Sequence, residues 1–286
     1  MIQLGLIGYP VSHSLSPKIQ NAALKVCGLE GNYSLFPIHP DDQQGLQDLL
    51  ARVDSGEITG LNVTTPHKQN VIPLLDELTP TAKAIGAVNV IYLREGKLIG
   101  HNTDAPGFLS DLNRFLSNLK SEIGNRKSAL VLGAGGSARS VVYALAEDGW
   151  KVTIASRRLE QAQGLISSFP NYQLQIMGWD LPNFQSLTSH LSLIVNTTSA
   201  GMTPNMDQSP LPENITLPTD IFIYDLVYNP RETKLVRDAR AQGLPATTGL
   251  GMLIEQAALS FEIWTGQTPP RETMRAAVEQ FPVSSL

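Results

Sequence analysis

Residues 129–138 decide the fold, and they read ALVLGAGGSA. Four apolar residues form a short strand pattern that runs directly into Gly133 and Gly135, and residues 139–145 then follow a helical pattern. In this G-x-G-x-x-A arrangement Gly133 permits a tight turn, Gly135 lets the backbone approach a pyrophosphate, and Ala138 lets the helix pack close to the sheet. The context predicts a dinucleotide site at a helix N-terminus. The alternative is an ordinary glycine-rich turn.

The end of the next expected strand indicates which dinucleotide is bound. A site for NAD usually has an Asp or Glu there, which binds the ribose 2′-hydroxyl. Residues 153–158 read TIASRR, so Arg157 and Arg158 stand at this position instead. A guanidinium can form a bidentate contact with a 2′-phosphate, which favours NADP(H) over NAD(H). We expect Glu160 one turn into the next helix. The alternative is a basic turn that only faces solvent.

Strands and helices alternate after residue 128. The expected strands lie at 129–132, 152–155, 173–176, 193–196, 221–226 and near Pro245. With helices between most of them, this order predicts a parallel, doubly wound sheet. We expect a polar turn at 121–127 and a loop at 202–217, which is rich in Pro, Asn and Ser. Two amphipathic helices, 252–265 and 271–280, follow.

The first hundred residues form an α/β series of their own. The expected strands lie at 3–7, 32–38, 60–63, 88–93 and 97–99, the last two forming a hairpin with Gly96 in the turn. The expected helices lie at 17–27, with Ser16 as N-cap, at 41–53, after Pro66, and at 104–119. We expect the last of these helices to cross into the second domain.

Composition excludes several classes of protein. The chain has 286 residues, enough for two domains, and its 42% hydrophobic content is that of a globular protein with a core. The net charge of −5 argues against a nucleic-acid partner. The single cysteine, Cys27, cannot form an intrachain disulfide. The sequence shows neither a signal peptide nor an apolar run of about 20 residues, so we expect a cytoplasmic protein without membrane partners.

Polar residues follow the expected strands of the first half. Ser14 and Ser16 come after the first strand, where hydroxyls suit a polyol or carboxylate ligand. Asn62 and Thr64 share one face of another strand, and Lys68 lies in the first turn of the next helix, where the helix dipole disfavours a cation. Such a lysine can act as a general acid or base. The alternatives are serines that stabilise a turn or a helix cap, and a surface lysine.

Asn89, Asn102 and Asp104 extend this set. Asn89 follows residues 86–88, and Asn102 and Asp104 lie where the chain passes to the second domain. Lys68 and Asp104 together would form a proton relay for a hydroxyl that becomes a ketone beside a nicotinamide ring. The alternative for Asp104 is the N-cap of the crossing helix, a role compatible with the first. The His and Asp residues do not show the spacing of metal ligands, so we predict no metal.

Taken in order, these motifs resemble those of the shikimate dehydrogenase family. The matching segments are SHSLSP at 12–17, NVTTPHK at 62–68, GAVN at 86–89, GHNTD at 100–104, GAGG at 133–136, NTTSAGM at 196–202, YDLVY at 224–228 and GLGMLIEQ at 249–256. The resemblance covers roughly residues 5–270. A single motif would be weak, whereas the ordered set is very specific.

The resemblance implies a role for each matching residue. Lys68 and Asp104 would be the catalytic pair. The substrate would be bound by this pair together with Ser14, Ser16, Asn62, Thr64, Asn89, Tyr228 and Gln256. The cofactor NADP(H) would be bound by Gly133, Ala134, Gly135, Gly136, Ser137, Ser156, Arg157 and Arg158, with Thr197, Leu226 and Gly249 beside the nicotinamide.

The resemblance also implies a fold and a reaction. The fold is α/β, with two α/β domains flanking a cleft. Residues 1–104, completed by the helices in 250–286, would be the substrate-binding and catalytic domain, and residues 105–249 the Rossmann domain that binds NADP. The implied enzyme is an oxidoreductase acting on a CH–OH group. It reversibly reduces 3-dehydroshikimate to shikimate with NADPH, in chorismate and aromatic amino acid biosynthesis.

Two departures from the family pattern and two alternative functions accompany the resemblance. Many members of the family have Asn-Arg-Thr where this chain has Ser156, Arg157 and Arg158, so Arg158 replaces a hydroxyl. Members that also oxidise quinate tend to have Thr at the position of Ser16, so Ser16 favours shikimate. The alternatives are a quinate/shikimate dehydrogenase that uses NAD, and a non-catalytic NADPH-binding sensor. A homodimer is one open possibility for the oligomeric state.

Overall fold

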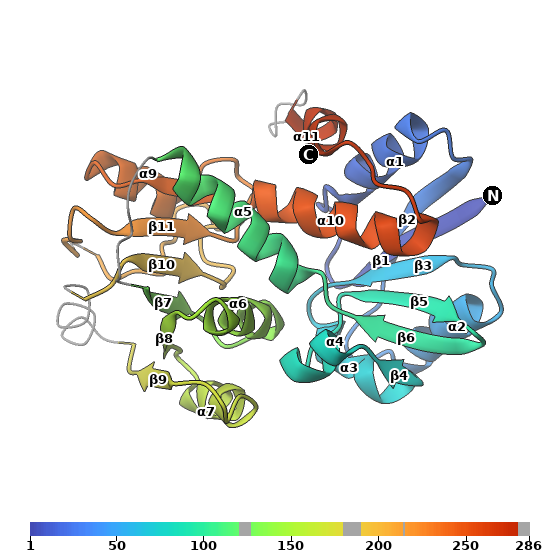
Figure 1. Cartoon of the computed structure of the whole chain (residues 1–286), viewed down its shortest axis with the longest axis horizontal. Coiled ribbons are helices and arrows are strands. Elements are labelled where there is room, and N and C mark those ends of the chain that lie inside the picture. Colours follow the sequence, from blue (N-terminus) through green and yellow to red (C-terminus); the bar gives the residue numbers. More distant parts are fainter. Residues whose placement is uncertain (120–126, 180–189, 214, 280–286) are drawn as a thin grey trace. The chain divides into compact units, whose positions relative to one another are not determined.

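The computed structural model describes residues 1–119, 127–179, 190–213 and 215–279 (Figure 1). The chain forms two compact units. Unit 1 comprises Met1–Gly107 and Ile254–Leu286, and unit 2 comprises Phe108–Leu253. The chain leaves unit 1 within helix α5 (Asp104–Asn118) and returns within helix α10 (Leu250–Thr265). Each unit has its own six-stranded sheet, which confirms the prediction of two α/β units.

The sheet of unit 1 is mixed, with strand order β2-β1-β3-β5-β6-β4. Its strands are β1 (Ile2–Gly8), β2 (Gly31–Pro37), β3 (Gly60–Val63), β4 (Glu77–Leu78), β5 (Val90–Arg94) and β6 (Lys97–His101). Strand β1 is parallel to β2 and β3, whereas β5 is antiparallel to β3 and β6. Glu95 and Gly96 both have positive φ, as a two-residue hairpin turn requires, which confirms the predicted hairpin.

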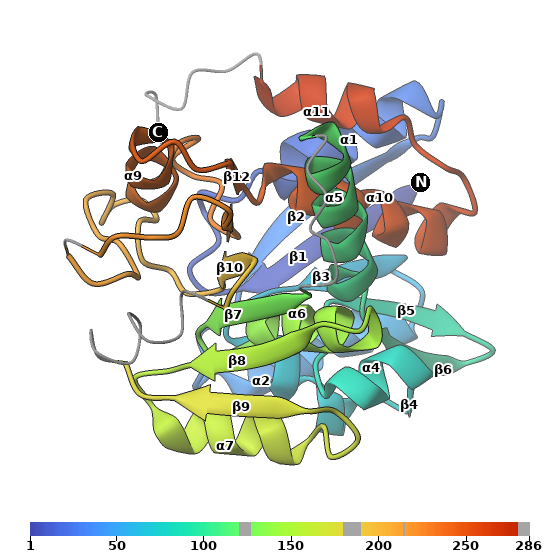
Figure 2. The same ribbon diagram turned by 60° about the vertical axis from the view of Figure 1, so that its left-hand side comes forward.

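Six α-helices belong wholly or partly to the described part of unit 1 besides α5. They are α1 (Ser16–Val26), α2 (Gln43–Asp54), α3 (His67–Asn70), α4 (Pro80–Ile85), α10 and α11 (Arg271–Glu279). A short 3-10 helix, η1 (Ile72–Leu74), follows α3. Leu46, Leu49, Leu50 and Val53 form the buried face of α2, as their spacing predicts. Helix α1 packs on β2 and α11, which Figure 2 shows from a second direction.

The sheet of unit 2 is entirely parallel, with order β12-β11-β10-β7-β8-β9. Its strands are β7 (Ser128–Leu132), β8 (Lys151–Ala155), β9 (Leu174–Met177), β10 (Leu193–Asn196), β11 (Phe222–Asp225) and β12 (Ala246–Thr248). The chain builds outward from β7 to β9 and then starts again at β10 on the other side of β7. This reversal creates a switch point, where ligands of such sheets bind beyond the carboxyl ends of the strands.

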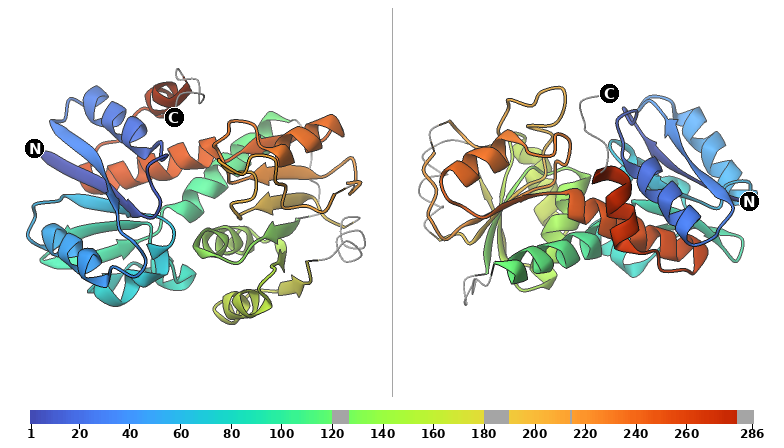
Figure 3. Two further views of the ribbon diagram at one scale, coloured as in Figure 1. Left: turned by 180° about the vertical axis from the view of Figure 1, so that it is seen from behind. Right: turned by 90° about the horizontal axis from the view of Figure 1, so that it is seen from above.

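Helices α6 (Gly136–Glu147), α7 (Leu159–Ser167) and α9 (Lys234–Ala241) pack on the sheet of unit 2, and Phe108 and Phe115 of α5 contact Phe222 and Tyr224 of β11. Helices α6 and α7 contact β7, β8 and β9, and α9 contacts β11 and β12. Because the sheet grows in two directions through right-handed connections, the helices lie on opposite faces, as the right-hand view of Figure 3 shows. The predicted loop between 202 and 217 contains no helix or strand at its described residues.

Two local predictions need correction, and a third falls outside the described residues. Ser16 is the first residue of α1 and not its N-cap, because Leu15 already has near-helical φ and ψ, and Ser14 Oγ accepts the Ser16 N–H at 3.2 Å. Helix α6 begins at Gly136, three residues earlier than its apolar pattern indicated. Most of the expected turn at 121–127, and residue 280, lie outside the described residues. No helix in the described ranges is both long and apolar enough to span a membrane.

Candidate active site and cofactor site

Lys68 and Asp104 form a buried ion pair in unit 1. Lys68 lies in the short helix α3 and Asp104 is the first residue of α5. The Lys68 Nζ lies 2.6 Å from Asp104 Oδ2, and the two residues are only 8% and 5% exposed. Burying either charge alone would be costly, so each depends on the other for compensation. The two predicted catalytic residues are therefore adjacent, and the Lys68 ammonium donates a short charge-assisted hydrogen bond to the Asp104 carboxylate.

Asn89 fixes the other side of the Asp104 carboxylate. Its side-chain amide donates to Asp104 Oδ1 at 2.9 Å and approaches Gln256 Oε1 at 3.4 Å. Its Oδ1 accepts the backbone N–H of Thr103 at 2.7 Å. Asn102 Oδ1 accepts the N–H of Ala105 at 3.2 Å, so Asn102 rather than Asp104 performs the capping role in the first turn of α5. The Asp104 carboxylate has no capping task and faces Lys68 and Asn89.

Asn62 lies beside Asn89 and joins the same polar cluster. Its Nδ2 donates to the carbonyl oxygen of Asn89 at 3.1 Å and to Ser260 Oγ at 3.0 Å. Its Oδ1 accepts the hydroxyl hydrogen of Tyr33 at 2.8 Å. The structure thus brings together five of the predicted residues: Lys68, Asp104, Asn89, Asn62 and Gln256. We call these five, with Thr103 and Ser260, the unit 1 polar cluster.

Sequence reasoning missed three members of this network. Thr103 lies inside the GHNTD motif at 100–104, but it was assigned no role from the sequence. Its Oγ1 lies 3.1 Å from Ser260 Oγ. Ser260 lies one helical turn after Gln256 on α10, so its i+4 spacing was an available signal. Tyr33 carried no signal, because one tyrosine in a strand is ordinary.

The other predicted substrate residues lie elsewhere. Ser16 is buried and Ser14 is half-buried in the loop that leads into α1, and Thr64 is half-buried directly after β3. Thr64 donates its backbone N–H to the carbonyl oxygen of Ile7 at 2.8 Å. Among the described residues, no hydrogen bond joins these three side chains to the unit 1 polar cluster. Tyr228 is a half-buried residue of unit 2.

The glycine loop of unit 2 has the features that a pyrophosphate site requires. Gly133 has φ of +110°, and a Cβ there would lie 2.6 Å from Thr197 Oγ1, so both conformation and space require glycine. Gly135 is the N-cap of α6, and a Cβ there would meet no atom within 4 Å. Ala138 is fully buried. The loop is therefore open at Gly135, beside the first N–H groups of α6, and it fits a dinucleotide phosphate.

The basic turn after β8 is preorganised by Ser156. The buried Ser156 hydroxyl donates to the carbonyl oxygen of Arg158 at 3.1 Å and accepts the backbone N–H of Arg158 at 3.2 Å. Arg157 and Arg158 are exposed. Glu160 lies in the first turn of α7. The end of β8 therefore presents two guanidinium groups and no carboxylate, an arrangement that fits a 2′-phosphate better than a free 2′-hydroxyl.

Thr197, Leu226 and Gly249 come together at the carboxyl ends of β10, β11 and β12. Thr197 Oγ1 donates to the carbonyl oxygen of Leu132 at 2.7 Å, next to the glycine loop. A Cβ on Gly249 would collide with the carbonyl oxygen of Leu226, so glycine permits this close approach of two backbones. These three residues therefore border the switch point of the sheet on the side opposite to the basic turn.

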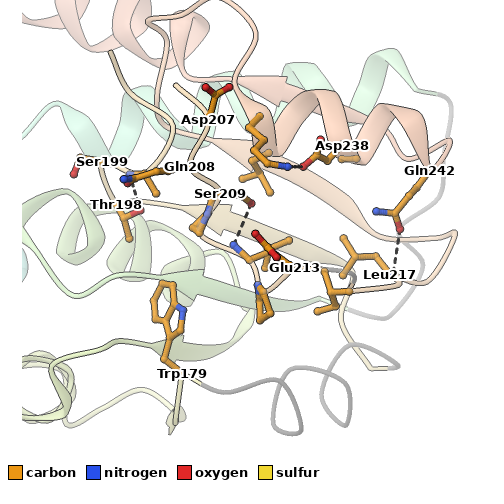
Figure 4. A pocket seen from close by; sticks show the side chains of 18 of the residues that line it. Trp179, Thr198, Ser199, Asp207, Gln208, Ser209, Glu213, Leu217, Asp238 and Gln242 are labelled. Carbon is orange, nitrogen blue, oxygen red and sulfur yellow. Dashed lines mark hydrogen bonds and ion pairs between the residues drawn. The ribbon is translucent and has the colours of Figure 1, made fainter. Parts of the chain in front are cut away.

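A cavity of about 900 Å³ lies beside this edge (Figure 4). Thr198 and Ser199 line one side, and Asp238 of α9 and Gln242 at its end lie on the other. Arg157 is the one residue that it shares with the predicted cofactor set. Most of the lining comes from residues 207–213, 215 and 217 and from α9, and the sequence predicted a loop in this region but no site. No group of three or more His, Cys, Asp or Glu residues that could hold a metal occurs within the described ranges.

Comparison with known proteins places these features in one family. The family described as "Shikimate dehydrogenase substrate binding domain" matches residues 6–91, "Shikimate / quinate 5-dehydrogenase" matches 117–235, and "Shikimate 5'-dehydrogenase C-terminal domain" matches 249–279. The shikimate dehydrogenase (NADP(+)) of Bacillus subtilis (strain 168) is 38% identical over 275 residues, which are 96% of this chain and 95% of the relative.

Solved structures agree with this assignment. The shikimate 5-dehydrogenase of Thermus thermophilus, solved with NADP(H) and shikimate, is 37% identical, with a TM-score of 0.84 over 98% of this chain and 99% of that one. The quinate dehydrogenase of Corynebacterium glutamicum, solved with NAD, is 32% identical, with a TM-score of 0.86 over 98% and 99%. From its motifs, its fold and these relatives, the chain belongs to the shikimate dehydrogenase family.

Proposed function

We propose that this chain is an NADP-dependent shikimate dehydrogenase. It reversibly reduces 3-dehydroshikimate to shikimate, a step in chorismate and aromatic amino acid biosynthesis. Its NADP-dependent relatives support the substrate and cofactor. The observation that carries the proposal is the buried Lys68–Asp104 pair, 2.6 Å apart, in a chain that also has the open glycine loop and the basic turn of an NADP site.

The residues of unit 1 bind the substrate and move the proton in this proposal. When bound, NADPH supplies the hydride. The Lys68 ammonium gives a proton to the oxygen that becomes a hydroxyl, and Asp104 holds the ammonium in place and stabilises its charge. Asn62, Thr64, Asn89 and Gln256 bind the ring hydroxyls, with Asn89 already oriented by its bond to Asp104. Ser14 and Ser16 bind the carboxylate, and Tyr228 also contacts the substrate.

The residues of unit 2 hold the cofactor. Gly133, Ala134, Gly135, Gly136 and Ser137 hold the pyrophosphate. Ser156, Arg157 and Arg158 bind the 2′-phosphate, and Thr197, Leu226 and Gly249 line the nicotinamide. In this assignment residues 1–104 with 250–286 are the substrate-binding and catalytic domain, and residues 105–249 are the NADP-binding domain. We further propose a cytoplasmic enzyme, with a homodimer as the state to test by light scattering.

The test is absorbance of the NADPH band with purified protein. Shikimate with NADP is compared with shikimate with NAD, quinate with NADP and quinate with NAD, and Lys68→Ala is the control. We expect rapid NADP reduction with shikimate that is lost in the variant. Faster turnover with quinate and NAD would favour the alternative that the C. glutamicum relative represents. No turnover with any pair, despite NADPH binding, would support a sensor instead.

A further inference from the structure

Another buried carboxylate, that of Asp225, has no role in the mechanism above. Asp225 is the last residue of β11 and is fully buried. Its Oδ1 accepts from Asn196 Nδ2 at 2.8 Å and from the Val227 N–H at 3.0 Å, and its Oδ2 accepts from Thr233 Oγ1 at 2.6 Å. One carboxylate thus connects the end of β10, the turn after β11 and the start of α9.

Two of these donors hold turns at the carboxyl edge of the sheet. Asn196 Oδ1 accepts the N–H and the hydroxyl hydrogen of Thr198 at 2.9 and 2.7 Å, which fixes the turn that contains Thr197. The Val227 N–H closes the turn that contains Leu226. Leu226 itself donates its N–H to the carbonyl oxygen of Asn196 at 2.9 Å, so the two turns are also joined directly.

Stability alone does not explain a carboxylate at this position. The hydrogen-bond partners of Asp225 within the described residues are all neutral. Burial raises the pKa of Asp225 to about 6, although the hydrogen bonds from Thr233, Val227 and Asn196 act in the opposite direction. A buried carboxylate without a cation carries an uncompensated desolvation cost. A role outside stability would account for a group that is costly to bury.

We propose that Asp225 is a positioning residue that sets the places of Thr197 and Leu226 at the nicotinamide end of the cofactor site. The proposal rests on the function proposed above, because that function puts these two residues beside the nicotinamide. Asp225 acts through the two turns and does not touch the cofactor. Acceptor oxygens are what the turns require, so an amide oxygen at the same place would keep most of the arrangement.

The experiment measures NADPH binding by fluorescence titration in Asp225→Ala and Asp225→Asn, far below their melting temperatures. We expect the dissociation constant to rise about tenfold in the alanine variant, equivalent to about 1.4 kcal/mol, and less than threefold in the asparagine variant. In the alanine variant we expect the KM for NADP to rise together with this dissociation constant, whereas the KM for shikimate stays within twofold. Asp148→Ala is the matched control. Asp148 also accepts from two side chains, Lys127 and Trp150, but lies at the amino end of the sheet.

The outcomes separate this proposal from the proposed function. Unchanged NADPH binding in folded Asp225→Ala, with normal turnover by the wild type, would overturn the positioning role only. Weakened NADPH binding in that variant, with no turnover by the wild type, would support positioning and overturn the shikimate dehydrogenase function. If Asp225→Ala does not fold, Asn196→Ala removes the donor that joins Asp225 to the turn containing Thr197, and we expect the dissociation constant to rise about fivefold. Unchanged binding in that variant would overturn the proposal.

Discussion

Asp104 and Asp225 are both buried carboxylates, but they are compensated in different ways. Asp104, in the unit 1 polar cluster, has the Lys68 ammonium 2.6 Å away. Asp225, at the edge of the second sheet, has only neutral donors among the described residues, from Asn196, Val227 and Thr233. The first arrangement pairs a cation with an anion across one short hydrogen bond. The second contains acceptors that hold loops in place. The proposals above therefore assign chemistry to Asp104 and positioning to Asp225.

Neutralising Asp104 should have the largest effect. Asp104→Asn removes the carboxylate that faces the buried Lys68 ammonium, so we expect turnover of shikimate to fall by about 10²- to 10⁴-fold, the range for a general acid or base. Removing one partner of a buried pair also costs about 3–5 kcal/mol of unfolding free energy. Steady-state kinetics and urea unfolding measure the two losses.

The same substitution in the other cluster is the control for this prediction. Asp225→Asn should keep turnover within a few fold, because the amide oxygen still accepts from Asn196 and Val227. Equal losses of turnover in Asp104→Asn and Asp225→Asn would show that the two carboxylates do not differ in the way that their partners indicate.

The pH dependence of stability should be the next largest effect. The folded pKa of Asp225 is raised from 3.8 to about 6, so the folded protein binds a proton more tightly than the unfolded chain does. This contribution to stability is fully present below the unfolded pKa and is lost as the pH rises through the folded pKa. A difference of roughly two between the folded and unfolded pKa corresponds to about 3 kcal/mol.

Asp225→Asn tests the direction of this pH dependence, because the asparagine side chain does not titrate. From about pH 4 to about pH 7, the unfolding free energy of the variant should rise by about 3 kcal/mol relative to the wild type. Urea unfolding at several pH values measures this difference. A difference that stays constant with pH would mean that Asp225 titrates in its ordinary range, and that the neutral donors compensate its charge fully.

Removing an exposed charge from the basic turn should have a smaller effect, a loss of NADPH affinity that depends on salt concentration. Arg157→Gln removes a guanidinium that faces solvent at the end of β8, so we expect NADPH binding to weaken about tenfold at low ionic strength and less at high salt. NADH binding should not change, since NADH lacks the 2′-phosphate. Titration with both cofactors at two salt concentrations measures this. Equal weakening for NADH would contradict the assignment of Arg157 to the 2′-phosphate.

The local part of each site could be predicted from the residues alone. The strand, glycine loop and helix of residues 129–138 are contiguous, so their spacing specifies the turn at Gly133 and the buried Ala138. The apolar pattern places the start of α6 too late, because Gly136 and Ser137 lack the spacing that marks a helix. The predicted N-cap of α1 is wrong by one residue, because a cap depends on backbone angles that neighbouring serines do not specify.

The unit 1 polar cluster is the opposite case, because distant segments build it. Gln256 lies 167 residues from Asn89, and Ser260 lies 198 residues from Asn62. Spacing cannot pair such residues, and only the family resemblance placed Gln256 in the site. Asp225 could have been identified from the sequence, because it is a single acid at the end of an apolar strand. A carboxylate at such a position is either hydrogen-bonded by several donors or functional.

Replacing Ser260 should have the smallest effect, and it tests how many members of the unit 1 polar cluster take part in catalysis. Its hydroxyl accepts from Asn62, contacts Thr103 and donates to the carbonyl oxygen of Gln256. Ser260→Ala removes one of the two acceptors of Asn62 Nδ2, whereas the carbonyl oxygen of Asn89 remains. We expect a loss of about 1 kcal/mol in unfolding free energy, the usual value of one hydrogen bond, and turnover within twofold. A loss of turnover beyond tenfold without a change in stability would place Ser260 in the catalytic network, which would then extend beyond Asn89.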